Sequence, residues 1–181
     1  VAGVPADSTS SILAKAIVLA DAGDTECALQ LLKSEGKSTN AIVNARCVCL
    51  IRLGRGEEAR KALRATVMQP DCTWMKPDVP VIYRTNFCIS LLLSGHPNGC
   101  QSSLMEMTER EHPSVQRVWQ TLDAWKRSLT FWQRVQWAVG LEPETQFVLD
   151  FVAGDFVEPL STLPTSVITQ NTVDRAASQA V

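Results

Sequence analysis

Apolar residues recur every three or four positions between Ile12 and Val139, a spacing that places them on one face of a helix. Short segments rich in Gly, Pro and polar residues interrupt this pattern, namely "DAGD", "SEGKST", "LGRG", "SGHPNG" and "EHPS". The breaks predict seven helices, over residues 11–22, 25–34, 40–53, 57–68, 79–94, 98–110 and 114–139. We therefore expect an all-α fold.

Three of the interruptions share one spacing, in "LADAGDTECALQLL", "LIRLGRGEEARKAL" and "LLLSGHPNGCQSSL". Each has a Gly, a small residue five positions later and a Leu four positions further on. The three sets are Gly23, Ala28 and Leu32; Gly54, Ala59 and Leu63; and Gly95, Cys100 and Leu104. Gly allows a tight turn between two antiparallel helices, the small residue lets them approach, and Leu fills the space between them. The spacing predicts three helix hairpins that stack on one another.

This spacing resembles the tetratricopeptide-repeat (TPR) family between about Ile12 and Arg110. At the small position of the first helix in each hairpin, the chain has Ala16, Cys47 and Cys88. The resemblance implies a right-handed stack of about three TPR-like hairpins. We expect a long Trp-rich C-terminal helix to cap this stack, followed by an extended tail.

The last predicted helix, 114–139, carries an apolar stripe that suits a capping helix. Its aromatic residues exceed what one stripe needs. Trp132, Arg134 and Trp137 are therefore candidates for a second interface, because Trp beside a basic residue suits a partner protein or a lipid headgroup layer.

The domain organisation follows from these patterns. We expect a flexible N-terminus over 1–10, a TPR-like helical domain with its capping helix over 11–139, and an extended strap over 140–156. Within the strap, "TQFVLDFVAGDF" alternates apolar side chains as a strand does. Residues 157–181 are rich in Ser, Thr and Pro and poor in aromatics, which predicts a disordered tail.

Composition narrows the class of protein. A chain of 181 residues that is 45% hydrophobic is long enough for one core. Its net charge of −2 gives no overall attraction for nucleic acid, so we predict no nucleic-acid partner. Basic residues outnumber acidic ones between 46 and 64, and acidic residues dominate beyond Gly140, so the two segments could pair with each other.

No apolar run approaches the roughly 20 residues that span a bilayer, and the first residues lack a signal-peptide pattern.

The six cysteines do not form a metal-binding pattern. Cys47, Cys88 and Cys100 occupy packing positions of the hairpins, and Cys47 and Cys49 lie on different faces of one helix. We predict no metal, no cofactor and reduced thiols, which favour a cytoplasmic location, peripheral to a membrane if the last helix binds one. His96 and His112 stand beside prolines in turns, and we find no nucleophile, base and orienting group together, so we predict a protein that is not an enzyme. An enzyme using Cys49 or Cys72 ranks last among the alternatives.

The TPR resemblance implies a concave groove that binds a peptide. By this resemblance the groove residues are Leu13, Ile17, Asn44, Val48, Ile51, Arg52, Thr85, Ile89 and Leu92. Family members that clamp a peptide's C-terminal carboxylate use Lys, Arg and Asn at set positions. Here those positions hold Leu13, Ile17, Ala45, Ile82 and Asn86, which leave only the Asn. A carboxylate clamp is therefore not expected.

The leading hypothesis is a non-catalytic protein–protein interaction module, a scaffold or adaptor that binds a protein or peptide in this groove. The alternative is a peripheral membrane-associated assembly factor that uses the Trp-rich C-terminal helix. Two further possibilities are self-association and a structural part of a longer repeat array that continues before Val1.

Overall fold

The computed structural model describes residues 6–36, 38–143, 145, 147 and 149–158. In these residues the chain is all-α, with eight helices and no strand. The helices are α1 (Ala6–Asp21), α2 (Thr25–Ser34), α3 (Asn40–Arg52), α4 (Gly56–Val67), α5 (Val81–Leu93), α6 (Pro97–Glu106), α7 (Pro113–Ser128) and α8 (Phe131–Ala138). Residues 6–10, predicted as part of a flexible N-terminus, belong to α1. The predicted disordered tail lies outside the described residues from 159 onward.

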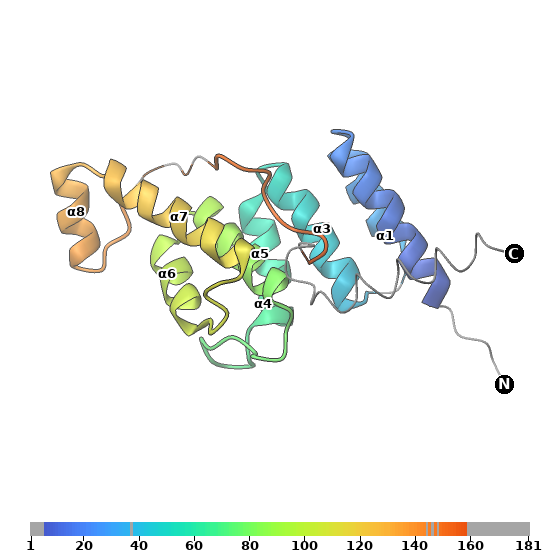
Figure 1. Cartoon of the computed structure of the whole chain (residues 1–181), viewed down its shortest axis with the longest axis horizontal. Coiled ribbons are helices and arrows are strands. Elements are labelled where there is room, and N and C mark those ends of the chain that lie inside the picture. The colour runs from blue at the N-terminus through green and yellow to red at the C-terminus, as the bar shows by residue number, and fades with distance from the viewer. Residues whose placement is uncertain (1–5, 37, 144, 146, 148, 159–181) are drawn as a thin grey trace, which may run out of the picture.

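The helices form a layered row. From α1 to α7 each helix packs against the next one along the chain, and α1, α3, α5 and α7 also contact one another in that order (Figure 1). Helices α2, α4 and α6 each lie between the helices that precede and follow them in sequence. The odd-numbered helices α1 to α7 therefore form one continuous face, and α8 lies at the far end of the molecule (Figure 1).

The three turn glycines share one backbone geometry. Gly23, Gly54 and Gly95 have φ values of 91°, 73° and 81°, which residues with a side chain rarely adopt. The residue after each glycine donates its N–H to a carbonyl five residues earlier, at 2.9, 2.8 and 2.8 Å, as in a Schellman turn. The small residues and leucines that follow in the three segments are all buried, with at most 1% of their surface exposed. These glycines therefore set the path of the chain between α1 and α2, α3 and α4, and α5 and α6.

The cysteines at the predicted packing positions are in the core. Cys47, Cys88 and Cys100 are fully buried, as the sequence predicts, and Cys49 is buried with them. Cys27 is exposed and Cys72 is half-buried. Four of the six thiols therefore act as compact apolar side chains.

The prediction of one helix over 114–139 is wrong, because the chain breaks into α7 and α8. Leu129 is extended, with φ −62° and ψ 136°, and its side chain is buried. Thr130 and Gln133 then form a capping box that starts α8. Apolar residues continue across the break at helical spacing, so the hydrophobic pattern did not reveal it.

A buried arginine ties two loops to α5. The side chain of Arg84, 6% exposed, donates to the carbonyl of Val79 and forms an ion pair with Glu109 in the connection between α6 and α7. Burial is the largest single influence on the pKa of Glu109 and would raise it, but the hydrogen bond and charge of Arg84, together with hydrogen bonds from the Glu109 main chain and Thr108, lower the pKa overall. Glu109 is therefore held as a carboxylate beside the end of the row that carries α7.

The basic and acidic segments, which the sequence allows to pair, form no ion pair with each other in the described residues. Arg52, Arg55, Arg60 and Lys61 pair with Asp21, Glu57 and Glu58. Acidic residues beyond Gly140 pair instead with His96, His112 and Arg117.

Candidate functional site

After α8 the chain turns back, and residues 149–158, which we call the return segment, run across the face of α7, α5 and α3 (Figure 1). Before it, Phe147 stacks on Trp125 with ring centroids 4.7 Å apart. The indole N–H of Trp125 donates to the Thr145 hydroxyl at 2.7 Å. These contacts anchor the turn, so that the return segment enters along α7.

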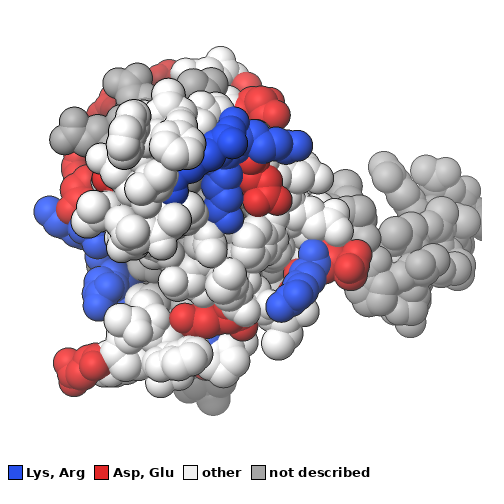
Figure 2. Space-filling view, turned by 90° about the vertical axis from the view of Figure 1, so that its left-hand side faces the viewer, with Lys and Arg blue, Asp and Glu red and all other residues white. Residues whose placement is uncertain are grey.

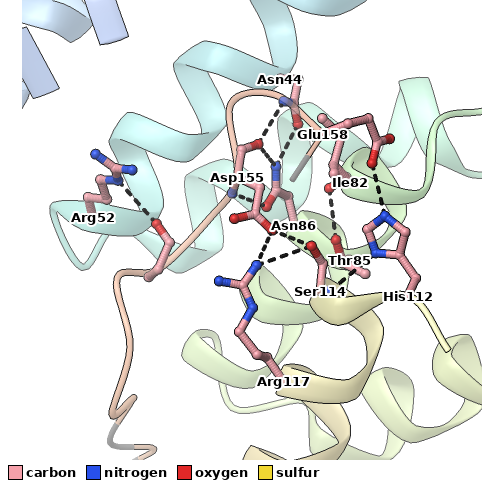
Figure 3. A network of polar contacts seen from close by, with 11 residues as sticks. Asn44, Arg52, Ile82, Thr85, Asn86, His112, Ser114, Arg117, Asp155 and Glu158 are labelled. Atoms are coloured by element: carbon pink, nitrogen blue, oxygen red, sulfur yellow. Dashed lines mark hydrogen bonds and ion pairs between the residues drawn. The ribbon is translucent and has the colours of Figure 1, made fainter. Parts of the chain in front are cut away.

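Two buried asparagines bind the main chain of Asp155. The amide nitrogen of Asn86, on α5, donates to the Asp155 carbonyl at 2.9 Å, and the Asp155 N–H donates to the amide oxygen of Asn86 at 2.9 Å. Asn44, on α3, donates to the same carbonyl at 3.3 Å and accepts from Asn86 at 2.8 Å (Figure 3). Both main-chain polar groups of Asp155 are thus bound by side chains of the inner helices.

The carboxylate of Asp155 is bound by the first turn of α7. It accepts hydrogen bonds from the Ser114 hydroxyl and from Arg117, each at 2.5 Å. The Arg117 guanidinium also donates to the Ser114 hydroxyl at 3.1 Å (Figure 3). The positive end of a helix further favours a carboxylate at this place. Main chain and side chain of one residue are therefore bound together.

His112 links the start of α7 to the end of the return segment. Its Nδ1 accepts from the Ser114 N–H at 3.2 Å, which in the neutral ring leaves the proton on Nε2. Nε2 can then donate to the Glu158 carboxylate, 2.9 Å away. The side chain of His112 is 9% exposed, so this contact lies close to the interior.

Two arginines lie against aromatic rings of the return segment. Arg52 stands 4.7 Å from the ring centre of Phe156 and donates to the Ala153 carbonyl at 3.3 Å. An ion pair with Asp21 holds its guanidinium in place. Arg117 lies 5.4 Å from the ring centre of Phe151. Each cation–π contact adds an attraction of the order of 0.5–2 kcal/mol.

Gly154 lies against α3 where a side chain would be tightly packed and its backbone strained. Its φ is +80°, and a Cβ added to it would lie 3.1 and 3.3 Å from the two methyl groups of Val48. Only glycine combines this conformation with so close an approach. We call the residues that hold 153–156 the socket: Asn44, Val48, Arg52, Asn86, Ser114 and Arg117.

Part of the groove remains open beneath the return segment. A cavity of about 560 Å³ lies between Phe147, Leu149 and residues 151–153 on one side and the turns that follow α1 and α3 on the other. Ile51, Leu93 and Phe151 are among the side chains that line it. The socket therefore holds 153–156 closely, whereas the preceding residues bridge a partly empty space.

The structure places the predicted groove residues in three groups. Asn44, Val48 and Arg52 contact the return segment. Ile51, Thr85, Ile89 and Leu92 are buried, whereas Leu13 and Ile17 are half-buried on α1. Sequence reasoning did not assign Ser114 and Arg117 to the site, and it noted Asn86 only as a remnant of the clamp pattern. An available signal was that Asn44 and Asn86 are polar residues among the many apolar residues of α3 and α5.

The residues of the predicted second interface have different surroundings. Trp132 is 74% exposed, next to Phe131 at 72%. Arg134 donates to the carbonyls of Leu129 and Arg127 and so caps the end of α7. Trp137 packs edge-on against Trp125, with ring centroids 5.1 Å apart. Of the three, Trp132 is the side chain that presents a broad apolar surface to solvent.

Uncharged surface predominates on the end of the molecule that carries α8, with Lys and Arg gathered in small groups (Figure 2). The large apolar side chains exposed there are Phe131, Trp132, Val135, Val139 and Leu141. We call these residues the α8 patch. Large apolar side chains exposed near one another are often part of contact surfaces.

The buried thiols are poorly suited to nucleophilic chemistry. Burial raises the pKa of Cys47 to about 12 and that of Cys49 to about 11, so both are protonated at neutral pH. Within the residues that the structure describes, no three His, Cys, Asp or Glu side chains group so as to hold a metal ion. In the same residues, no helix has the length and apolar character needed to cross a bilayer.

No protein-family model, curated protein or solved structure matches the chain. Its function must therefore be proposed from the residues of the socket and of the α8 patch.

Proposed function

We propose that the chain is a non-catalytic protein-interaction module that binds an extended segment of a partner protein across α3, α5 and α7. The observation that carries this proposal is the pair of hydrogen bonds between Asn86 and both main-chain groups of Asp155. Such pairing recognises an extended backbone as a neighbouring strand would, whatever the side chains. The socket is thus suited to a linear segment.

The arrangement of the helices supports a TPR-like character for this module. The repeated spacing of "LADAGDTECALQLL", "LIRLGRGEEARKAL" and "LLLSGHPNGCQSSL" coincides with three turns of one geometry. The side-by-side contacts of α1, α3, α5 and α7 are those of a stack of hairpins. We accordingly propose a scaffold or adaptor role in the cytoplasm, the compartment in which buried thiols stay reduced.

The decisive variant is Asn86→Ala, which removes both main-chain contacts without adding charge. Asn98→Ala is the matched control, because the Asn98 side chain, on α6, makes one hydrogen bond within the described residues, to the Gly140 carbonyl. The comparison uses an Asp155→Ala background, which weakens the hold of the chain's own return segment on the socket. In that background a partner isolated with the chain should bind Asn98→Ala equally and Asn86→Ala about tenfold more weakly or worse. Equal binding by a folded Asn86→Ala chain, checked by circular dichroism, would exclude the groove as the binding surface.

A second candidate function is supported by the α8 patch. Exposed Trp132 and Phe131, with Arg127 and Arg134 nearby in sequence, suit the headgroup layer of a membrane. The chain would then be a peripheral membrane-associated assembly factor. Exposed aromatic side chains are the observation behind this candidate, and they suit contact between two copies of the chain as well.

Vesicle cosedimentation distinguishes these uses of the α8 patch. Vesicles containing phosphatidylserine should retain the wild type but not the Phe131→Ser, Trp132→Ser double variant. The control is Trp74→Ser, because Trp74 is 63% exposed but lies between α4 and α5. If no form binds vesicles at low salt, the membrane role is excluded. A dimer that only the double variant disrupts, seen by sedimentation velocity, would indicate self-association.

A further inference from the structure

We infer that the partner segment carries a Gly, an acidic residue and an aromatic residue in succession, and that Gly154, Asp155 and Phe156 are an intramolecular mimic which this partner displaces. The inference rests on the proposed function and specifies the partner's chemistry. A different feature of the socket selects each of Gly154, Asp155 and Phe156, and the way in which the return segment is held allows its displacement.

The first position requires glycine. The backbone there has φ +80°, which residues with a side chain rarely adopt, and a Cβ would lie 3.1 and 3.3 Å from two methyl groups of Val48. A partner residue with a side chain would have to push Val48 aside by a few tenths of an ångström and also adopt a strained backbone. Many extended segments could pair with Asn44 and Asn86 through their backbone, but the contact with Val48 disfavours those that lack a glycine at this position.

The second position requires a carboxylate. Ser114 and Arg117 both donate to it at the start of α7, and no other acidic side chain is bonded to this pair in the described residues. The Asp155 side chain is only 18% exposed, so its charge is shielded from solvent. An amide in its place would lose the ion pair and would direct N–H groups at donors.

The third position favours an aromatic ring. The Arg52 guanidinium lies over the ring of Phe156, and its ion pair with Asp21 fixes it there. An aliphatic side chain would keep part of the contact area but lose the attraction between cation and ring. The socket therefore distinguishes Phe, Tyr or Trp from Leu at this position.

The return segment is bound in a way that allows it to leave. Its hold on the socket combines the hydrogen bonds of Asp155 with partly buried apolar contacts of Ala153 and Phe156. Val152 and Val157 are 68% and 63% exposed, and a cavity of about 560 Å³ adjoins Phe147, Leu149 and residues 151–153. Stacking of Phe147 on Trp125 would keep the chain tethered after 153–156 had left. A tethered segment competes at an effective concentration of the order of millimolar, so a partner must bind the open socket tightly to replace it.

The test uses the full chain and a fluorescein-labelled peptide with the sequence of residues 149–158, LDFVAGDFVE. Fluorescence anisotropy compares its binding to the wild type, to Asp155→Ala and to the control Asp150→Ala, which removes an exposed acid of the same segment. Asp155→Ala weakens the internal competitor and should bind the peptide about tenfold more tightly or better, whereas Asp150→Ala should behave as wild type. Adding Asn86→Ala to Asp155→Ala should abolish binding, which places the peptide in the socket.

Peptide variants test each position in the Asp155→Ala chain. The changes Gly154→Ala, Asp155→Asn and Phe156→Leu in the peptide should each weaken binding about tenfold. If the Asp155→Asn peptide binds as well as the parent, the carboxylate is not recognised and the inference is wrong.

Folding of the variants decides the remaining outcomes. If Asp155→Ala unfolds, Phe156→Leu serves as a milder release variant, and unfolding of both would show that the segment belongs to the core, against displacement. A folded release variant that binds the peptide no better than wild type also overturns the inference. The proposed function would still stand if a natural partner lacking Gly, acid and aromatic residues depended on Asn86, and both would fall if no ligand depended on it.

Discussion

Asn86 and Asp155 lie 69 residues apart in the sequence and are joined by two hydrogen bonds that use both main-chain polar groups of Asp155. Because the Asn86 amide nitrogen also donates to Asn44, the orientation of its amide group is set before any segment is bound. The inner helices therefore present a preorganised pair of amides to an extended chain.

Removing Asn44 should loosen this pair. Asn44→Ala takes away a buried acceptor of Asn86 and a donor to Asp155, so we expect the free energy of unfolding to fall by about 1–3 kcal/mol in urea denaturation. Asn40→Ala is the control, since Asn40 is exposed in the first turn of the same helix. Equal stabilities of the two variants would show that the Asn44 contacts contribute little.

Gly154→Ala should release the return segment locally. The change combines a left-handed backbone with the contact to Val48, and we expect a cost of about 1–2 kcal/mol. Hydrogen exchange should show faster exchange of the Asp155 amide, with the amides of α3 protected as before. In the control Gly36→Ala, the added Cβ meets no atom within 4 Å, and exchange should not change. An unchanged rate in Gly154→Ala would contradict the close approach.

The ion pair of Arg84 and Glu109 should make stability depend on acidic pH. The pKa of Glu109 is lowered from 4.5, so its carboxylate stabilises the fold above about pH 4.5, and this contribution is lost as pH falls through the lowered pKa. We expect Glu109→Gln to be less stable than wild type at pH 6 and to lose less stability between pH 6 and pH 3. The exposed Glu111→Gln is the control. Parallel pH profiles of wild type and Glu109→Gln would refute the assignment.

The thiols should react in two classes with a disulfide reagent at pH 8. Cys27 and Cys72 are accessible, whereas Cys47, Cys49 and the two other buried thiols should react only after unfolding. A hydrogen bond with Asp24 raises the pKa of Cys27, so Asp24→Ala should make Cys27 react faster. Rapid reaction of a third thiol in the folded chain would contradict the burial described here.

Local patterns carried enough information for the hairpins but not for the site. Gly23, Gly54 and Gly95 mark their turns because only glycine takes that backbone conformation cheaply. The break at Leu129 was not predicted, because the apolar residues keep their helical spacing across it. The new helix is started by a capping box of two polar side chains, which the apolar spacing does not reveal. A helix boundary of this kind depends on capping rather than on periodicity.

The place of the return segment could not be predicted for a different reason. The strap over 140–156 was expected to be extended, but its contacts join residues up to 111 positions apart, and those that fix Asp155 are polar. Asn44 was predicted by the TPR resemblance, whereas Ser114 and Arg117 look like ordinary surface residues at the start of a helix. Their role depends on Asp155, which no local spacing connects to them.

The long sequence separation of these contacts also affects the order in which parts of the chain fold. The helices close short loops with their sequence neighbours, whereas the return segment must close loops of 38 to 111 residues, so we expect it to dock last in folding. During synthesis α7 is complete at Ser128, and 30 more residues must be added before Glu158 exists. At a synthesis rate of about 5–20 residues per second, the socket residues are present without the return segment for a few seconds. A partner present on the ribosome would meet the socket before its internal competitor is made.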